Sequence, residues 1–318
     1  MLLVISKRLI STLITLLGVT VVIFVILRLL PGNAIESSMG VNAGLLSHAQ
    51  ILQLDHYYGI GESASSQFFS WLGATLSGNL GVSLASRVSV SSLIGQAFPV
   101  TLELAIMTMI LALLIGVLFG IAGALRPGKL GDAAGQGVAL VGLGIPSFVI
   151  GTAVVTILSS GFGYFPSSQT WAGLFSNPWL NLQQIFFPAL VLSIGIGAAI
   201  MRTTRTAVLD VSTQNFIRTA RGKGLRGQAV IWRHLFLNAL VPIVTMSGIQ
   251  LGYLLGGTVI IEQIFVLPGL GRLLVTSITS HDYPVVQSVT LLFAVCFVIL
   301  NLLTDAICAL IYPRQREN

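Results

Sequence analysis

Long apolar runs, each flanked by polar or charged residues, recur along this chain of 318 residues. A bilayer core about 30 Å thick is crossed by roughly 20 apolar residues in a helix, and six runs reach or approach that length. They predict transmembrane helices at Leu9–Leu30, Pro99–Leu125, Ala134–Ser160, Phe186–Met201, Leu237–Ile261 and Val285–Tyr312. The fourth run is the shortest. The pattern therefore predicts an all-α membrane protein with about six transmembrane helices.

The segments outside these runs predict the domain organisation. Residues 1–30 hold the first transmembrane helix, which is too long for a signal peptide and is followed by no convincing A-x-A site. Residues 31–98 contain turn formers and an aromatic cluster around Trp71, and they predict a folded extracytoplasmic insertion. Residues 99–312 predict a five-helix core that contains a cytoplasmic loop, residues 202–236. Residues 313–318 form a cytoplasmic tail.

Charge is scarce and unevenly placed. Charged residues make up 8% of the chain, whereas soluble domains carry about 25%. The loop 202–236 accounts for the net charge of +6, because it contains seven basic residues and a single acidic one, Asp210. The basic residues are Arg202, Arg205, Arg218, Arg221, Lys223, Arg226 and Arg233. The charge thus follows membrane topology, and we expect no nucleic-acid partner.

The distribution of basic residues also predicts orientation. With a cytoplasmic N-terminus and six spans, only Arg28, Arg87 and Arg272 of the 16 Lys and Arg residues fall on the outer side. Because basic residues gather on the cytoplasmic side, both termini are predicted to be cytoplasmic.

Motifs for catalysis or cofactor binding are incomplete. Gly123–Leu130 begins like a phosphate-binding loop, but Leu130 stands where Ser or Thr would hold magnesium, and a membrane helix precedes it. The four histidines and two cysteines have no metal-ligand spacing. Glu103, Glu262 and Asp305 lie toward helix ends, so no central charge indicates a proton relay. We expect no catalytic residue, cofactor or metal on this chain.

Glycines at four-residue spacing mark faces for close helix contact. Gly248, Gly252 and Gly256 form such a face in the fifth run, and Gly116 and Gly120 form another in the second. Both faces predict tight helix packing, and the first could also line an interface with a second subunit. In the third run, Pro146 removes one backbone hydrogen bond and predicts a kink.

The cytoplasmic loop predicts a helix, a glycine turn and a second helix. Phe216, Ala220 and Lys223 fall near one face of the first helix, while Gly224 and Gly227 allow the chain to reverse direction. A helix lying across the cytoplasmic surface is suited to docking another protein. A basic loop also arises from topology and from attraction to anionic membrane lipid, so both interpretations stay open for its arginines.

This loop resembles the coupling loop of permease subunits of ATP-binding-cassette importers, whose Glu-Ala-Ala-x-x-x-Gly motif contacts the ATPase. Ala220 and Gly224 occupy its third and seventh positions, and Arg218 and Thr219 replace Glu-Ala. The run is similar to the form used by the peptide/nickel branch. The resemblance implies ATPase coupling by Arg218, Thr219, Ala220, Lys223, Gly224 and Leu225.

Short ordered matches to the same family extend along the chain. They include Leu27–Gly32, Gly78–Ser83, Pro99–Ala105, Ile145–Phe148, Ile260–Phe265, Pro268–Arg272, His281–Val286, Asn301–Asp305 and Tyr312–Arg314. The resemblance implies a subunit of the bacterial inner membrane that pairs with a homologous permease. Two cytoplasmic ATPases that carry ATP and magnesium, and an extracytoplasmic solute-binding protein, would complete the importer.

Within this family the expected cargo is di- or oligopeptides, moved by alternating access. Nickel or a metal-chelator complex is the alternative cargo. A secondary carrier driven by an ion gradient is an alternative of another class, but it calls for inverted repeats and central charges, and neither is evident in the sequence. A membrane scaffold without transport activity is a third possibility.

Overall fold

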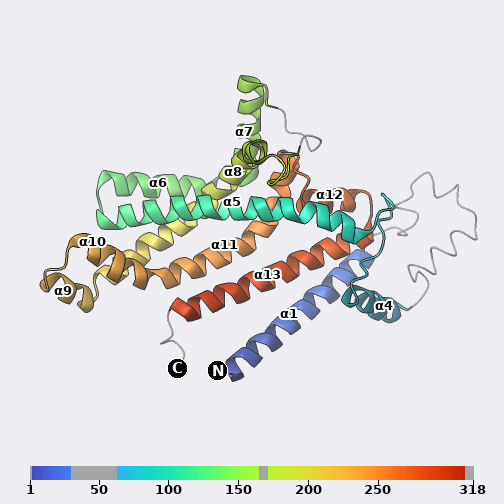
Figure 1. Cartoon of the computed structure of the whole chain (residues 1–318), viewed down its shortest axis with the longest axis horizontal. Coiled ribbons are helices and arrows are strands. Elements are labelled where there is room, and N and C mark those ends of the chain that lie inside the picture. Colours follow the sequence, from blue (N-terminus) through green and yellow to red (C-terminus); the bar gives the residue numbers. More distant parts are fainter. Residues whose placement is uncertain (1, 30–62, 165–170, 312–318) are drawn as a thin grey trace, which may run out of the picture. The chain divides into compact units, whose positions relative to one another are not determined.

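The computed structural model describes residues 2–29, 63–164 and 171–311 (Figure 1). These residues form helices and, apart from an isolated antiparallel bridge between Val82 and Ser89, no β structure. The prediction of an all-α protein is confirmed. The chain divides into two compact units, one of residues 1–100 and 269–298, and the other of residues 101–268 and 299–318.

The first unit combines the first 100 residues of the chain with residues 269–298, which lie much later in the sequence. It holds α1 (Leu2–Leu29), α4 (Ala64–Leu76), the start of α5 (Val90–Leu125), α12 (Leu270–Thr279) and most of α13 (Tyr283–Ile311). Its core is an apolar cluster that includes Val90, Leu270, Val285 and Val289. Val90 precedes the other three residues by 180 to 199 positions in the sequence, so the unit depends on long-range packing.

Aromatic contacts attach α4 to α1. The Phe24 ring lies edge-on to Phe68, with ring centroids 5.1 Å apart, and 6.0 Å from Trp71. These residues are part of the cluster that predicted a folded insertion. Most of the remaining insertion, residues 31–62, lies outside the described residues, so its folding stays a prediction.

A buried carboxylate fastens the loop after α4 to the turn between α12 and α13. Asp282 is 2% exposed and accepts hydrogen bonds from the Ser83 hydroxyl (2.5 Å) and from the backbone N–H groups of Leu84 (3.1 Å) and Ala85 (3.4 Å). A buried carboxylate is tolerated where several donors surround it. Two of the short family-like motifs, Gly78–Ser83 and His281–Val286, therefore meet at this point.

The second unit is a helical bundle. It holds most of α5, α6 (Leu130–Gly144), α7 (Ser147–Phe162), α8 (Pro178–Ser212), α9 (Asn215–Gly222), α10 (Gly227–Val230), the π-helix η3 (Ile231–Phe236), α11 (Leu237–Ile264) and the end of α13. α8 contacts α6, α7 and α11 (Figure 1). A buried cluster that includes Ala112, Ile200, Val208 and Ala239 forms its core.

Small residues bring α5 and α8 together. A Cβ atom added to Gly116 would lie 2.6 Å from the Ile200 side chain, and one added to Gly120 would lie 2.7 Å from Thr204. These distances are too short for any side chain, so glycine is required at both positions. The tight packing expected from the spacing of these two glycines is present.

Several helices extend beyond the predicted runs. α5 begins at Val90 and contains Pro99, and α8 begins at Pro178 after Asn177, whose side chain accepts a hydrogen bond from the Leu180 N–H (3.2 Å). Asn at the cap with Pro at the first helical position is a strong start signal. The apolar runs identified the spans but not these polar ends.

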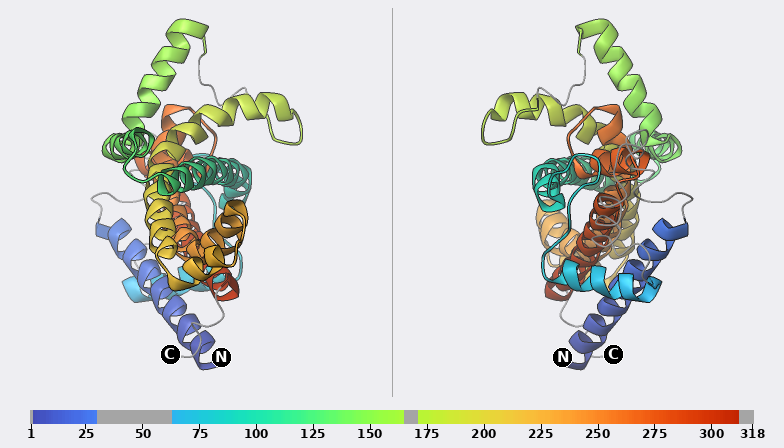
Figure 2. Two further views of the ribbon diagram at one scale, coloured as in Figure 1. Left: turned by 90° about the vertical axis from the view of Figure 1, so that its left-hand side faces the viewer. Right: turned by 90° about the vertical axis from the view of Figure 1, so that its right-hand side faces the viewer.

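The third predicted span is broken rather than kinked. α6 and α7 meet at Ile145 and Pro146 with a bend of 95°, which Figure 2 shows as α7 leaving the line of α6. Proline disfavours the helical conformation for the residue before it, and Ile145 has the extended values φ −91° and ψ 120°. In the described part of the chain, four helices are long and apolar enough to span a membrane, or five if α6 and α7 form one span. The count of six stays a prediction.

The incomplete phosphate-binding motif forms the turn between α5 and α6. Gly128 has φ +73°, and its N–H donates to Asp132 Oδ2 (2.9 Å). The same carboxylate, 4% exposed, receives a two-pronged contact from Arg205 on α8, with Nε 2.6 Å from Oδ1 and Nη2 2.8 Å from Oδ2. Asp132 therefore fixes the turn to α8, a role that the sequence did not indicate.

Glu262 is the most deeply buried of the three membrane carboxylates considered from the sequence. It is fully buried on α11, and the Thr101 hydroxyl donates to its Oε1 (2.7 Å). Asp305 is exposed on α13, whereas Glu103 is half-buried and hydrogen-bonded to Asn181. The described residues contain no cluster of three His, Cys, Asp or Glu residues suited to a metal.

Candidate functional site

The loop between α8 and α11 folds as the helix, turn and helix that its sequence predicts. α9 ends at Gly222, and the Gly224 N–H donates to the Arg221 carbonyl (2.9 Å) while the Leu225 N–H donates to the Ala220 carbonyl (3.3 Å). Gly224 has φ +77°, a left-handed conformation that glycine adopts without strain. We call residues 215–236, comprising α9, α10 and η3, the coupling hairpin.

The inner face of the coupling hairpin is apolar. Ile217 and Ala220 on α9 pack with Val230 and Leu235, and these four side chains are at most 6% exposed. Ala220 was predicted on the same face as Phe216 and Lys223, but in the structure it points inward while those two residues are exposed. Its small side chain allows α9 to lie close to the second arm.

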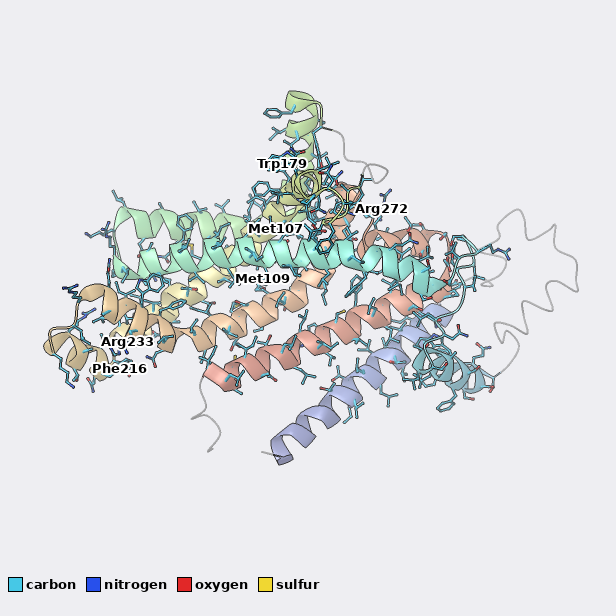
Figure 3. The ribbon with its side chains drawn as sticks, in the orientation of Figure 1. Met107, Met109, Trp179, Phe216, Arg233 and Arg272 are labelled. Carbon is cyan, nitrogen blue, oxygen red and sulfur yellow. The ribbon has the colours of Figure 1, made fainter. Side chains whose placement is uncertain are left out.

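The outer face is basic with apolar members. Of the predicted coupling residues, Arg218, Thr219, Lys223, Gly224 and Leu225 are exposed, and only Ala220 is buried. Phe216 is 41% and Trp232 55% exposed, and Figure 3 shows Phe216 and Arg233 on this hairpin. Aromatic and arginine side chains are enriched in protein interfaces, so the face is suited to a protein partner.

A π-helix forms the last part of the coupling hairpin and runs directly into α11. Residues Ile231–Phe236 form it, and Trp232 stacks edge-on with Phe236 at 5.5 Å. π-helical turns are uncommon and occur often at functional sites. The apolar and basic pattern gave no signal for it, because the pattern of a π-helix differs little from that of an α-helix over six residues.

The three glycines predicted for helix contact have different surroundings. A Cβ atom on Gly248 would lie 2.3 Å from Thr304 of α13, so this glycine packs within the chain. Gly252 is half-buried, whereas Gly256 is exposed, and a Cβ atom added to it would have no heavy atom within 4 Å. The glycine face therefore begins at a contact inside the chain and ends on its surface.

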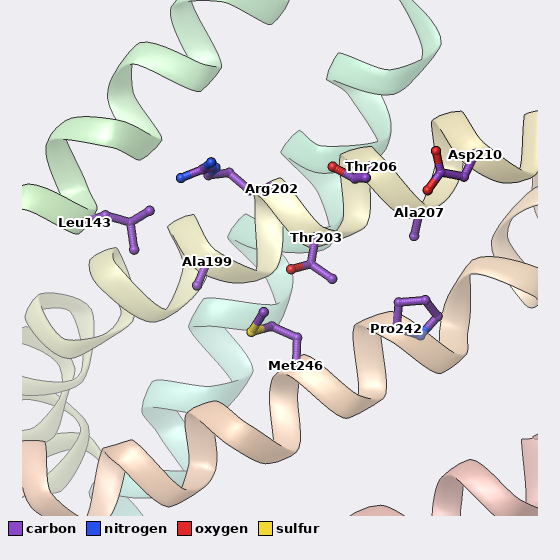
Figure 4. A pocket seen from close by; sticks show the side chains of 9 residues that line it. All are labelled: Leu143, Ala199, Arg202, Thr203, Thr206, Ala207, Asp210, Pro242 and Met246. Atoms are coloured by element: carbon purple, nitrogen blue, oxygen red, sulfur yellow. The ribbon is translucent and has the colours of Figure 1, made fainter.

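A pocket of about 450 Å³ lies between α6, α8 and α11 (Figure 4). Arg202, Thr203, Thr206 and Asp210 of α8 line one wall, and Pro242 and Met246 of α11 line the other. Leu143, one residue from the end of α6, closes one side. The pocket was not predicted, because the fourth apolar run was taken to end at Met201 and Arg202 and Asp210 were assigned to the cytoplasmic loop. In the structure α8 continues to Ser212, so both residues are helical.

These features define the class of the protein. It is a multi-pass helical membrane protein in which two membrane-length helices, α8 and α11, are joined by a hairpin with an exposed basic face. Residues 112–317 match the family described as binding-protein-dependent transport system inner membrane component, and the chain belongs to this family.

Curated relatives match almost the whole chain. The glutathione transport system permease protein GsiC of Salmonella choleraesuis (strain SC-B67) is 36% identical over 313 residues, which cover 98% of this chain and 97% of the relative. The oligopeptide transport system permease protein AppB of Bacillus subtilis (strain 168) is 36% identical over 313 residues, 98% of each chain. The chain is thus a permease of a peptide-class ATP-binding-cassette importer.

Solved structures support the fold. Inward-facing conformations of the MetNI methionine ABC transporter match with TM-scores of 0.54 and 0.56 at 18% and 17% identity. They cover 70% and 69% of this chain, and 97% and 96% of theirs. At this identity the likeness concerns the fold alone.

Proposed function

We propose that this permease imports short peptides, forming the translocation path together with a second, homologous permease subunit. The observation that carries the proposal is its end-to-end similarity to proteins named as glutathione and oligopeptide permeases. The names of these two relatives contain no metal, which favours peptides over nickel as cargo.

ATP hydrolysis in this proposal takes place on two separate cytoplasmic ATPase subunits, which hold ATP and magnesium. The coupling hairpin supports this division, because its sealed apolar interior makes it a preformed unit and its outer face remains available. A solute-binding protein would deliver peptide on the extracytoplasmic side. Both termini would be cytoplasmic, in keeping with the placement of basic residues.

Alternating access is the proposed mechanism. Closure of the ATPase dimer would move the coupling hairpin, and the hairpin would transmit this motion directly into α8 and α11, the helices that it joins. A rigid hairpin is required for such transmission, since a flexible one would absorb the displacement. The Ile217, Ala220, Val230 and Leu235 cluster provides that rigidity.

Reconstitution tests the proposal. The permease is co-purified with its partners, placed in liposomes, and supplied with its solute-binding protein and with labelled trialanine, glutathione or Ni²⁺. We expect uptake of at least one peptide that requires ATP and stops when ATP is replaced by a non-hydrolysable analogue. Uptake of Ni²⁺ alone would contradict the cargo, and peptide uptake driven by an ion gradient without ATP would contradict the importer mechanism.

A further inference from the structure

The pocket between α6, α8 and α11 carries opposite charges at its two ends. Arg202 and Asp210 lie eight residues apart on α8, with Thr206 midway, so the three share one face of the helix. In Figure 4 Arg202 lies toward Leu143 and Asp210 lies toward Pro242, with the Thr203 and Thr206 hydroxyls between them. Neither charged side chain has an ion-pair partner among the described residues.

We propose that this pocket binds a short zwitterionic peptide during transport, with Arg202 holding its carboxylate and Asp210 its ammonium group. The proposal rests on the function proposed above and deepens it by assigning a cargo site to this chain. The permease would then recognise the two termini of its cargo itself, in addition to any selection by a solute-binding protein.

The dimensions of the pocket fit such a ligand. A helix rises about 1.5 Å per residue, which places the Cα atoms of Arg202 and Asp210 about 12 Å apart along α8. An extended peptide of three to four residues covers about the same length. The volume of about 450 Å³ lies within the range of roughly 300–1,000 Å³ typical of small-molecule sites.

The chemistry of the lining favours a zwitterion over an anion. A lipid phosphate or an inorganic anion would be attracted to Arg202 but repelled by Asp210 in the same pocket. Hydroxyls of Thr203 and Thr206 can donate to and accept from peptide amides, and Met246 and Leu143 offer apolar walls that accept varied side chains. A site with charges for the termini and a permissive middle recognises peptides by their length.

Photolabelling with defined probes tests the orientation of the ligand. The probe is trialanine with a diazirine side chain on either its first or its third residue, applied to the whole transporter in lipid nanodiscs without ATP or solute-binding protein. We expect the third-residue probe to label Leu143 or Ala199, near Arg202, and the first-residue probe to label Ala207 or Pro242, near Asp210. Mass spectrometry identifies the labelled residues.

Charge variants test the two anchors. Arg202→Gln and Asp210→Asn should each reduce labelling at least tenfold at a fixed probe concentration, since each removes one charge-assisted contact. The exchanged pair, Arg202→Asp with Asp210→Arg, should exchange the positions labelled by the two probes. Arg126→Gln, a loss of an exposed basic residue on the turn after α5, is the matched control and should leave labelling unchanged.

A blocked peptide tests the proposal without any change to the protein. N-acetyl-trialanine amide carrying the diazirine has no terminal charge, and we expect it to label the pocket at least tenfold less than the free peptide. Equal labelling by both would overturn the proposal. So would labels confined to residues outside the pocket, or pocket labelling by a diazirine phospholipid that excess trialanine does not displace.

Uptake measured in the same preparation distinguishes failure of this binding site from failure of the proposed function. ATP-driven peptide uptake that proceeds without specific pocket labelling would overturn this site and leave the proposed function standing. Specific labelling with no ATP-driven peptide uptake would overturn the proposed function and support the pocket as a peptide site.

Discussion

Two glycines near the turn of the coupling hairpin, Gly222 and Gly224, differ in backbone conformation but not in the space around them. Gly224 has φ +77°, whereas Gly222 is the last residue of α9, and neither has a heavy atom within 4 Å of an added Cβ. Space is therefore available at both positions, and only backbone conformation separates them. A side chain in the left-handed region costs about 1–2 kcal/mol, and the cost is higher for a β-branched residue.

We expect Gly224→Val to uncouple ATP hydrolysis from uptake while the protein still inserts in the membrane. The strained turn would shift the outer face of the hairpin, which carries most of the predicted coupling residues. ATPase activity and peptide uptake are measured in the same liposomes, and uptake per ATP should fall at least tenfold. Gly222→Val adds the same side chain without the left-handed strain, and its coupling should be much closer to that of the wild type. Normal uptake by Gly224→Val would refute the coupling assignment.

The Asp132 carboxylate holds both the turn after α5 and the guanidinium of Arg205. Arg205→Lys keeps the charge but cannot form the two parallel contacts that a guanidinium makes, so we expect a lower melting temperature in detergent. Asp132→Asn should lower it as well, and the double variant should lose less than the sum of the single losses, since both break one contact. Arg126→Gln is the exposed control. Additive losses would show that the two residues act independently.

At the scale of helices, glycine spacing has two different uses. Gly248 permits α11 to approach Thr304 of α13, and Gly116 and Gly120 permit α5 to approach α8. Gly256, two turns beyond Gly248, has nothing within 4 Å and is exposed. Because Gly256 has no packing role within the described chain, it is the member of the face best placed for the predicted contact with a second permease.

Substitutions by alanine separate these uses. Gly248→Ala would overpack the α11–α13 contact, and we expect it to destabilise the chain by about 1–3 kcal/mol. Gly256→Ala should be neutral or slightly stabilising in the isolated chain, because alanine is the better helix former. Unfolding by SDS titration in mixed micelles measures both. Gly256→Leu should weaken co-purification of the second permease, and unchanged co-purification would remove Gly256 from the interface.

At the scale of the whole chain, the features that the sequence predicts are those set by local pattern. Apolar runs revealed membrane helices, and Gly224 with its basic neighbours revealed the coupling hairpin. Features set by contacts between distant residues were not foreseen. Asp132 and Arg205 are 73 positions apart, and Ser83 and Asp282 are 199 apart, so no periodicity connects them. The inward orientation of Ala220 depends on the second arm of the hairpin, which the face of a single helix cannot reveal.

Membrane orientation concerns the chain as a whole and gives the last prediction. Single cysteines are introduced at Gln228, in the coupling hairpin, and at Ser65, in α4, after Cys296 and Cys308 are replaced by Ser. Both target positions are exposed. Because basic residues concentrate around Gln228 and are sparse around Ser65, the positive-inside rule places them on opposite sides of the membrane. A membrane-impermeant maleimide should label the Ser65 position in spheroplasts and the Gln228 position only in inverted vesicles. Labelling of both positions from one side would contradict the predicted topology and, with it, the assignment of the hairpin to cytoplasmic ATPases.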